Sequence, residues 1–482
     1  MMPIFLLMLA LQTSPAPAGI ANNQPPADSV ALSLPEALTR ALRNGDEAKA
    51  AAAQVEVTDA QVTVARSAGL PQLRINASQS HVYESARAAA VGSIFNQPNT
   101  YTAQAQLTQP LFQGGRIVAG ARAASALRNQ SKYEQTETLA QVSLDVQRAY
   151  LTALLADRLA EIQDTAYALA GQRLQQVQQF ERAGRASRYD VLRAQVEQTN
   201  LQPAVIQARG DVELALVDLR RLINVPATQP LKLTTRLDTA SVLGWVNDLK
   251  GYTGPVNRAA LRSAEALSTA RHAGVSVARA DLLPTVSISG LIGGQAFPQS
   301  GFPASAGRIE TVDCPPGSAE GRVCTSQNGG WFRDKSFNIT VGIPIFDGLR
   351  AKGNIDLASA QARLADLQLA QTRELVASEA ASTRAELDRA EALFRAQGQN
   401  AAQATEAFSL ATLRYNRGLA TQLEVADAQL ALTQARTNQA RAVYDLYIAA
   451  ASYARALGRP PQMFELPGAP RTALTPNTKS AP

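Results

Sequence analysis

An internal repeat constrains this chain more than any other feature of its sequence. The segment QPLFQGGR at residues 109–116 returns as IPIFDGLR at residues 343–350, which is 234 positions later. Further positions return at the same spacing, namely Gly184, Ser187, Asp190, Ala194 and Gln195 as Gly418, Thr421, Glu424, Ala428 and Gln429. Because a fixed offset over such a length marks a duplicated structural unit, the chain is predicted to fold as two similar halves.

The repeat also predicts the domain organisation. Residues 19–226 are predicted to form the first repeat and residues 257–460 the second, and residues 227–256 are predicted to form a linker or equatorial segment between them. Residues 1–18 contain an apolar run followed by Ala-Pro-Ala, which is typical of an export signal with an A-x-A cleavage site, although no Lys or Arg precedes the run. Residues 461–482 are rich in Pro, Thr and Ala and are predicted to be a disordered tail.

Each half contains a stretch in which apolar and polar residues alternate strictly. Tyr101, Ala103, Ala105 and Leu107 are separated by Thr and Gln, and shorter runs of the same kind occur near residues 73, 286 and 339. This period of two predicts β-hairpins at about residues 72–111 and about residues 285–345. It is typical of transmembrane strands with one face toward lipid and one toward a lumen. A soluble sandwich with one hydrated face would give the same alternation.

Four strands are too few to close a barrel within one chain. The smallest single-chain membrane barrels have about eight strands, and an open edge in hydrocarbon leaves backbone groups without partners. Several copies are therefore expected to pool their hairpins. The longer loop of the second half, about residues 295–335, is expected outside the membrane.

Both cysteines lie in that loop. Cys314 and Cys324 have nine residues between them, and in an oxidising compartment this spacing predicts a disulfide that closes the loop. Two unpaired loop thiols are the alternative.

Long helices occupy most of the remaining sequence. Residues 116–184 contain no proline, and at 1.5 Å per residue they reach roughly 100 Å. Gly184 and Gly418 are predicted to end such helices, and Ser187 and Thr421 to cap the next ones. The result is a helical hairpin in each half, over 116–223 and 350–457. Two Ala-rich segments, 36–66 and 257–280, are expected to extend the shorter return helices end to end. A helical core of a cytosolic scaffold would show the same helices.

The composition disfavours nucleic-acid binding and catalysis. The net charge is +6, but Lys and Arg are scattered singly between acids and form no basic cluster. His81 and His272 are far apart, and the sequence has no nucleophile elbow and no phosphate-binding glycine loop. We therefore predict no enzyme activity, no metal and no cofactor.

These motifs resemble the TolC-like outer membrane efflux protein family. The resemblance rests on a short opening helix at residues 34–42, on Leu-Pro at residues 283–284, and on RYNRGLAT at residues 414–421. It also rests on the pattern PxFxGxR, which occurs at residues 110–116 and 344–350, where a predicted strand ends in each half. It covers about residues 30–460 and implies a mainly α fold with a transmembrane β part. In that fold a homotrimer builds a 12-stranded β-barrel, with four strands per chain, and continues it as a long periplasmic α-helical barrel.

The resemblance also implies a gate at the helical tips. In the best-known members a tyrosine three residues before the second tip glycine interacts with an acid after the first, and these positions are Tyr415 and Asp190 here. An assisting arginine of those members is replaced by Ala420, so the closing contacts must differ, with Arg417 or Arg188 as candidates. Acids that ring the aperture match Glu424 and Asp427, and their crowding in a trimer implies cation selectivity.

The same residues also have ordinary structural interpretations. Glu424 could serve only as a helix cap, and Asp427 only as a first-turn acid favoured by the helix dipole. Tyr415 could be an aromatic that packs between helices. The tip residues Gly184 and Gly418 are needed for helix reversal whatever the tips bind.

The predicted function is an outer membrane channel-tunnel that conducts substrates to the exterior, in efflux or type I secretion. Its expected partners are outer membrane lipid, an inner-membrane pump of RND or ABC type, and a periplasmic adaptor (membrane fusion) protein at Gly184, Ser187, Gly418 and Thr421. The alternative is an exported coiled-coil scaffold protein without channel activity.

Overall fold

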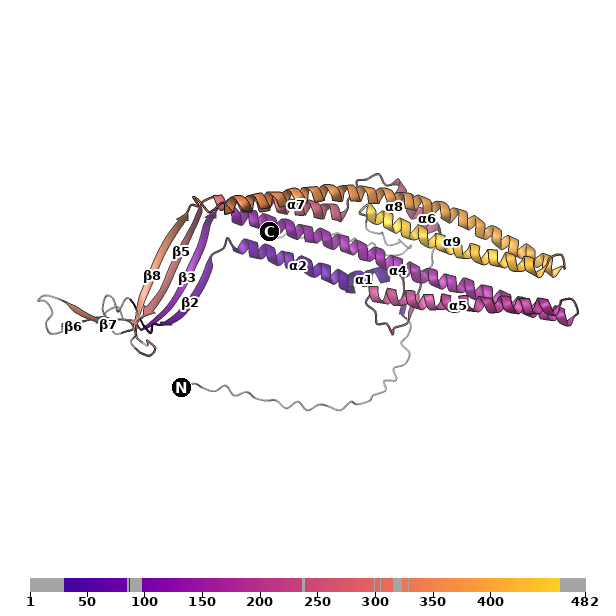
Figure 1. The fold of residues 1–482 in the computed structure, drawn as a ribbon, viewed down its shortest axis with the longest axis horizontal. Coiled ribbons are helices and arrows are strands. Elements are labelled where there is room, and N and C mark those ends of the chain that lie inside the picture. Colours follow the sequence, from indigo (N-terminus) through magenta and orange to yellow (C-terminus); the bar gives the residue numbers. More distant parts are fainter. Residues whose placement is uncertain are drawn as a thin grey trace, which may run out of the picture.

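A computed structural model shows an elongated molecule with a β-sheet at one end and two helical tips at the other (Figure 1). It describes residues 30–84, 86, 98–235, 239–298, 300–303, 305–314, 323–327 and 329–459. The predicted signal peptide (1–18) and C-terminal tail (461–482) lie outside the described residues. The expected mainly helical fold with four long strands per chain is confirmed.

Two helices of 67 residues run most of the length of the molecule, α4 (Arg116–Arg182) and α8 (Arg350–Asn416). The return helices α5 (Arg188–Leu222) and α9 (Gln422–Ala456) lie beside the halves of α4 and α8 that are farther from the sheet, and they form the two tips. The helices α2 (Asp46–Ser67) and α7 (Ala259–Arg279) pack along the halves that face the sheet. A short 3-10 turn, η2 (Ala280–Leu282), leads from α7 into the sheet.

The segment expected as one helix over residues 36–66 is broken in two. The first part, α1 (Leu34–Asn44), ends before Gly45, whose extended backbone (φ −63°, ψ 140°) separates it from α2. Ser33 caps α1 in a capping box with Glu36, whereas Asp46 and Glu47 favour the N-terminus of α2 through its dipole. A separate start signal therefore exists for each helix.

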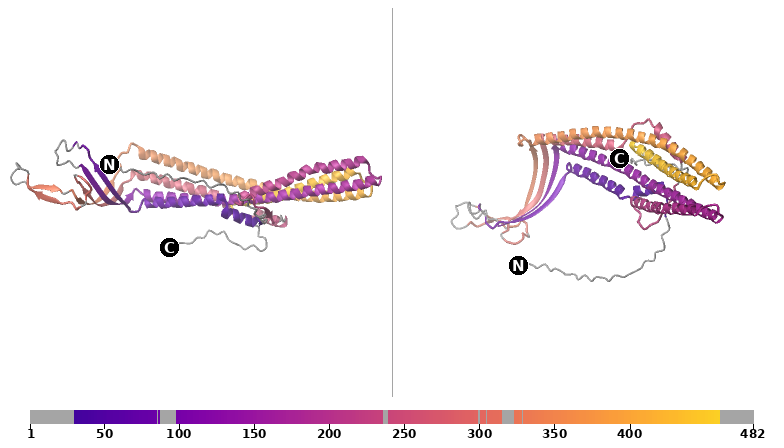
Figure 2. Two further views of the ribbon diagram at one scale, coloured as in Figure 1. Left: turned by 90° about the horizontal axis from the view of Figure 1, so that it is seen from below. Right: turned by 45° about the vertical axis from the view of Figure 1, so that its right-hand side comes forward.

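The sheet is antiparallel, with the strand order β2-β3-β5-β8. Its strands are β2 (Gln72–His81), β3 (Asn99–Gln113), β5 (Thr285–Ala296) and β8 (Trp331–Gly342), and they curve together away from the ends of the helices (Figure 2). Leu73 pairs with Leu107, which pairs with Gly290, which pairs with Phe337. Because paired residues share a face, most of the alternating apolar residues lie on one face of the sheet and most of the polar residues lie on the other.

The second-half loop contains a small hairpin that the sequence did not predict, β6 (Ile309–Val312) and β7 (Cys324–Gln327). Cys314 is disulfide-bonded. The side chain of Cys324 lies outside the described part of the chain, so the pairing of the two stays a prediction.

The middle of the molecule holds elements that the sequence did not predict, two of them within residues 227–256, the predicted linker or equatorial segment. Strand β1 (Val30–Leu32) pairs in parallel with β4 (Leu231–Leu233), and α6 (Thr239–Gly251) follows. One apolar core gathers here around Tyr150, Leu219 and Ile223, and a second core joins α6 to α8 and α9 around Leu387 and Leu446. Among the described residues, none of the helices is long and apolar enough to cross a membrane.

A glycine at the end of α9 provides a test of this packing. Gly458 has φ +71°, and a Cβ there would lie 2.3 Å from the carbonyl oxygen of Asn257. We expect Gly458→Ala to lower the melting temperature of the purified protein by several degrees, since the backbone conformation alone costs roughly 1–3 kcal/mol. The control is Gly398→Ala within α8, where a Cβ meets open space. Equal melting temperatures for the two variants would contradict the prediction.

Candidate functional site at the helical tips

Each tip is a helix reversal built from a glycine and a capping box. Gly184 (φ +71°) and Gly418 (φ +74°) take the left-handed conformation that ends α4 and α8. Ser187 then caps α5, accepting a hydrogen bond from the Asp190 amide at 3.2 Å, and Thr421 caps α9 in the same way with Glu424 at 3.4 Å. Both acids also accept a hydrogen bond from the backbone amide of their cap residue.

The structure brings Tyr415 of α8 close to Asp190 of α5. Burial raises the pKa of the Tyr415 hydroxyl, and the nearby Asp190 carboxylate raises it further, whereas the charge of Arg173 acts in the opposite direction. Hydrogen bonds from Ser187 lower the pKa of Asp190. The Tyr415 ring also lies 6.2 Å from the ring of Phe180 on α4. Tyr415 is therefore a half-buried, un-ionised phenol that contacts Phe180 of the other hairpin and lies near the charged Asp190 carboxylate.

Arg173 of α4 is a tip residue that the sequence did not reveal. Its side chain is only 7% exposed, and its guanidinium donates to Glu197 of α5 at 3.1 Å and to Gln429 of α9. Gln429 in turn donates to the carbonyl oxygen of Ala166 at 3.0 Å. Arg173 thus joins the first hairpin to the second through a nearly buried polar network. A departure from the repeat could have indicated it, because Ala407 stands at the matching position of the second half.

The other predicted tip residues lie at the surface. Glu424 forms an ion pair with Arg414 at 3.6 Å in addition to its capping contacts. Asp427 is exposed and has no charged partner in the part of the chain that the structure describes. Arg188 pairs with Glu181 of its own hairpin at 3.8 Å. A further contact between hairpins runs from Gln176 to Asn416 at 2.8 Å.

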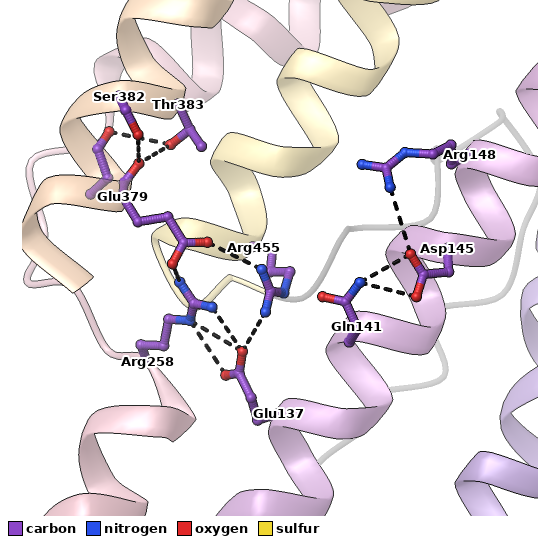
Figure 3. Close-up of polar contacts among 10 residues, drawn as sticks. Glu137, Gln141, Asp145, Arg148, Arg258, Glu379, Ser382, Thr383 and Arg455 are labelled. Atoms are coloured by element: carbon purple, nitrogen blue, oxygen red, sulfur yellow. Dashed lines mark hydrogen bonds and ion pairs between the residues drawn. The ribbon is translucent and has the colours of Figure 1, made fainter. Parts of the chain in front are cut away.

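A second charged cluster lies at mid-length, where α9 ends and α7 begins (Figure 3). Glu137 of α4 accepts hydrogen bonds from Arg258 at 2.9 Å and from Arg455 at 2.8 Å, and Glu379 of α8 contacts both arginines. The Arg258 side chain is only 6% exposed. Burial alone would raise the pKa of Glu137, but the two arginines outweigh it and the net pKa is lowered. This cluster ties α4, α8, α9 and the start of α7 together.

We predict that this cluster makes stability depend on pH. A carboxyl with a lowered folded pKa stabilises the fold above its unfolded pKa and loses that contribution as the pH falls through the folded value. The melting temperature should therefore fall below about pH 5. Glu137→Gln should cost roughly 1–3 kcal/mol at pH 7, a range reduced from that of a fully buried pair because the cluster is partly exposed. The Glu137→Gln variant should also show a melting temperature that depends less on pH than that of the wild type.

The control for this experiment is Glu56→Gln, which removes an exposed acid from the middle of α2. It should leave both the neutral-pH stability and the pH profile nearly unchanged. A Glu137→Gln variant with the wild-type profile would show that the cluster does not cause the pH dependence.

The geometry defines a class of protein. A curved sheet with one apolar and one polar face leads into helices of 67 residues, and these end in polar tips. No group of His, Cys, Asp and Glu among the described residues is arranged to hold a metal ion. A curved sheet with an apolar face that continues into long helices is the arrangement of a membrane conduit that extends beyond the bilayer.

Comparisons with known proteins agree with that class. A family model described as "Outer membrane efflux protein" matches residues 37–225 and 255–459. Protein CyaE of Bordetella pertussis is 26% identical over 388 residues, covering 79% of this chain and 74% of CyaE. The outer membrane efflux protein BepC of Brucella suis is 23% identical over 432 residues, covering 88% and 85%. The crystal structure of VceC from Vibrio cholerae has a TM-score of 0.69 and 19% identity, covering 88% and 96%.

The chain belongs to the outer membrane efflux protein family. It is a TolC-like channel of the Gram-negative outer membrane, with helices that extend into the periplasm, and it is not an enzyme. Channels of this family form trimers. The expected channel function is thus confirmed, and the alternative of a scaffold without channel activity is not supported.

Proposed function

We propose that three copies of this chain pool their four strands into one 12-stranded barrel and gate the conduit at the helical tips. A periplasmic adaptor would bind the tips around Gly184, Ser187, Gly418 and Thr421, and an inner-membrane pump of RND or ABC type would supply the energy for efflux or type I secretion. The observation that carries the gating proposal is the buried link from Arg173 to Gln429, which joins the two hairpins of one copy.

The contacts at the tips are suited to being broken and remade. Apart from the ring contact of Tyr415 with Phe180, those described above are hydrogen bonds and ion pairs, and a typical neutral hydrogen bond contributes only about 1 kcal/mol net. At mid-length, by contrast, the hairpins are fixed by apolar cores around Tyr150 and Leu446. An adaptor that binds the tips more tightly in the open state could therefore separate the hairpins at one end without unfolding the middle.

The gate proposal predicts a leak when the tip network is removed. Arg173→Gln combined with Tyr415→Phe should raise the basal conductance of the purified trimer in planar bilayers severalfold, because the charged link between the hairpins and the partner of Asp190 are both lost. Each single variant should raise it less.

The matched control is Arg209→Gln. Arg209 of α5 pairs with Asp164 of α4 at 2.8 Å, but this pair lies within the first hairpin and is exposed. The Arg209→Gln variant should therefore conduct at the wild-type level. If the double variant also conducts like the wild type, Arg173 and Tyr415 are not part of the gate.

A second prediction concerns ion selectivity. In a trimer, Glu424 and Asp427 of three copies would surround the narrow end of the conduit and attract cations. Glu424→Gln with Asp427→Asn should therefore reduce the cation preference, measured as the reversal potential across a KCl gradient.

The control for selectivity removes two acids from α2, far from the tips, as Glu47→Gln with Glu56→Gln. Both residues are exposed, and the control should keep the wild-type reversal potential. An unchanged potential in the tip variant would mean that Glu424 is only a helix cap and Asp427 only a first-turn acid.

A further inference from the structure

Strand β8 changes from apolar to basic along its outward face. Phe337, Ile339 and Val341 lie on this face and are 60–67% exposed. The next two positions on the same face, moving away from the helices, are Lys335 and Arg333, which are also exposed. The strand therefore carries two cations where its apolar surface ends.

The length of the apolar surface places these cations near a membrane boundary. The exposed apolar residues continue past β8 to Ile345, so the run from Phe337 spans roughly 26 Å along the chain. With the usual strand tilt this is roughly 20 Å along the membrane normal, close to the apolar band of about 25 Å in membrane barrels. Because the helices lie on the periplasmic side, Lys335 and Arg333 lie on the side of the outer leaflet.

Aromatic rings mark the same boundary. The Trp331 ring lies 6.4 Å from that of Phe302, which lies 5.3 Å from that of Tyr101. Trp331 is on the same face as Arg333, since the two are separated by one residue of β8. Aromatic girdles of this kind occur where a barrel surface meets the lipid headgroups.

Among the residues that the structure describes, the two cations have no paired counter-charge on their own face. Arg333 pairs across the sheet with Gly294, which has no side chain, and Lys335 pairs with Ile292. Asp334 lies between them in sequence and so faces the opposite side of the sheet. Within the described part of the chain, neither cation forms an ion pair or a side-chain hydrogen bond. An anion supplied from outside the chain fits this position.

We propose that Arg333 and Lys335, bordered by the aromatic ring of Trp331, bind the phosphate groups of lipid headgroups in the outer leaflet. Arginine can donate two parallel hydrogen bonds to a phosphate, and lysine adds a point charge. The lipid chains would then lie against Phe337, Ile339 and Val341. The inference rests on the proposed barrel assembly, because that assembly turns this face toward lipid.

The test measures lipid binding to the full-length trimer by native mass spectrometry, with bisphosphorylated lipid A as the probe. Arg333→Gln with Lys335→Gln should weaken lipid A binding about 25-fold, because each lost charge should cost about fivefold in affinity. Lipid A without its phosphates should bind the wild type as weakly as it binds this variant. Millimolar inorganic phosphate should not displace the lipid.

Two further variants control the experiment. Arg74→Gln removes a cation from the polar face of the same sheet and should bind lipid A like the wild type. Arg333→Lys with Lys335→Arg keeps both charges and should retain most of the affinity. If the double Gln variant does not form trimers, the single variants are measured, and each should lose about fivefold.

Wild-type affinity in the Gln variants would overturn the inference, as would equal binding of dephosphorylated lipid A or displacement by inorganic phosphate. Planar-bilayer conductance separates this result from the proposed function. If the trimer conducts but binds phosphorylated and dephosphorylated lipid A equally, only the proposed lipid site is contradicted. If the trimer does not conduct, the channel proposal is contradicted.

Discussion

Backbone hydrogen bonding at the two open edges of the sheet is the constraint on which the architecture depends. Strands β2 and β8 each have a neighbour on one side only, and in hydrocarbon every unpaired amide or carbonyl costs several kcal/mol. Side chains cannot remove this cost, because it belongs to the backbone. A second copy can, by pairing its β2 with the free edge of β8, and repetition of that pairing around an axis closes the structure. The positions of α4 and α8, which follow β3 and β8, are then set by the sheet.

The free energy that holds the helices together is distributed unevenly along the rod. The middle contains the apolar cores around Tyr150 and Leu446 and the ion cluster of Glu137 with its arginines. Toward the tips, the two hairpins are joined by polar contacts, such as Arg173 with Gln429 and Gln176 with Asn416, beside the ring contact of Tyr415 with Phe180. Apolar burial is non-directional and is lost gradually, whereas a polar link is lost when its geometry changes. A conduit can therefore be rigid in the middle and switchable at one end.

The sequence predicts those elements of the fold that depend on a local pattern of residues. Strict alternation defined the strands, the helical period and the tip glycines defined the helices, and capping residues such as Ser187 and Thr421 located the reversals. The sequence did not predict pairings that join distant segments, such as β1 with β4, or the helix α6, which its neighbours stabilise. Arg173 was missed for the same reason, because it contacts Gln429 across 256 positions. The proximity of Tyr415 to Asp190, seen in the electrostatic effect of the carboxylate on the hydroxyl, was expected from the family resemblance and not from any local signal.

The two halves have diverged where their surroundings differ. At the end of α5 the left-handed position is Asn224, whose side chain donates to the carbonyl oxygen of Asn44 at 3.2 Å, whereas the matching position after α9 is Gly458. There the backbone of Asn257 comes too close for any side chain, because the chain entering α7 runs against the end of α9. The ion cluster of Arg258 and Arg455 occupies the same junction. The two equivalent hairpins therefore end at differently held junctions, one with a charged cluster and the other with the neutral amide of Asn224.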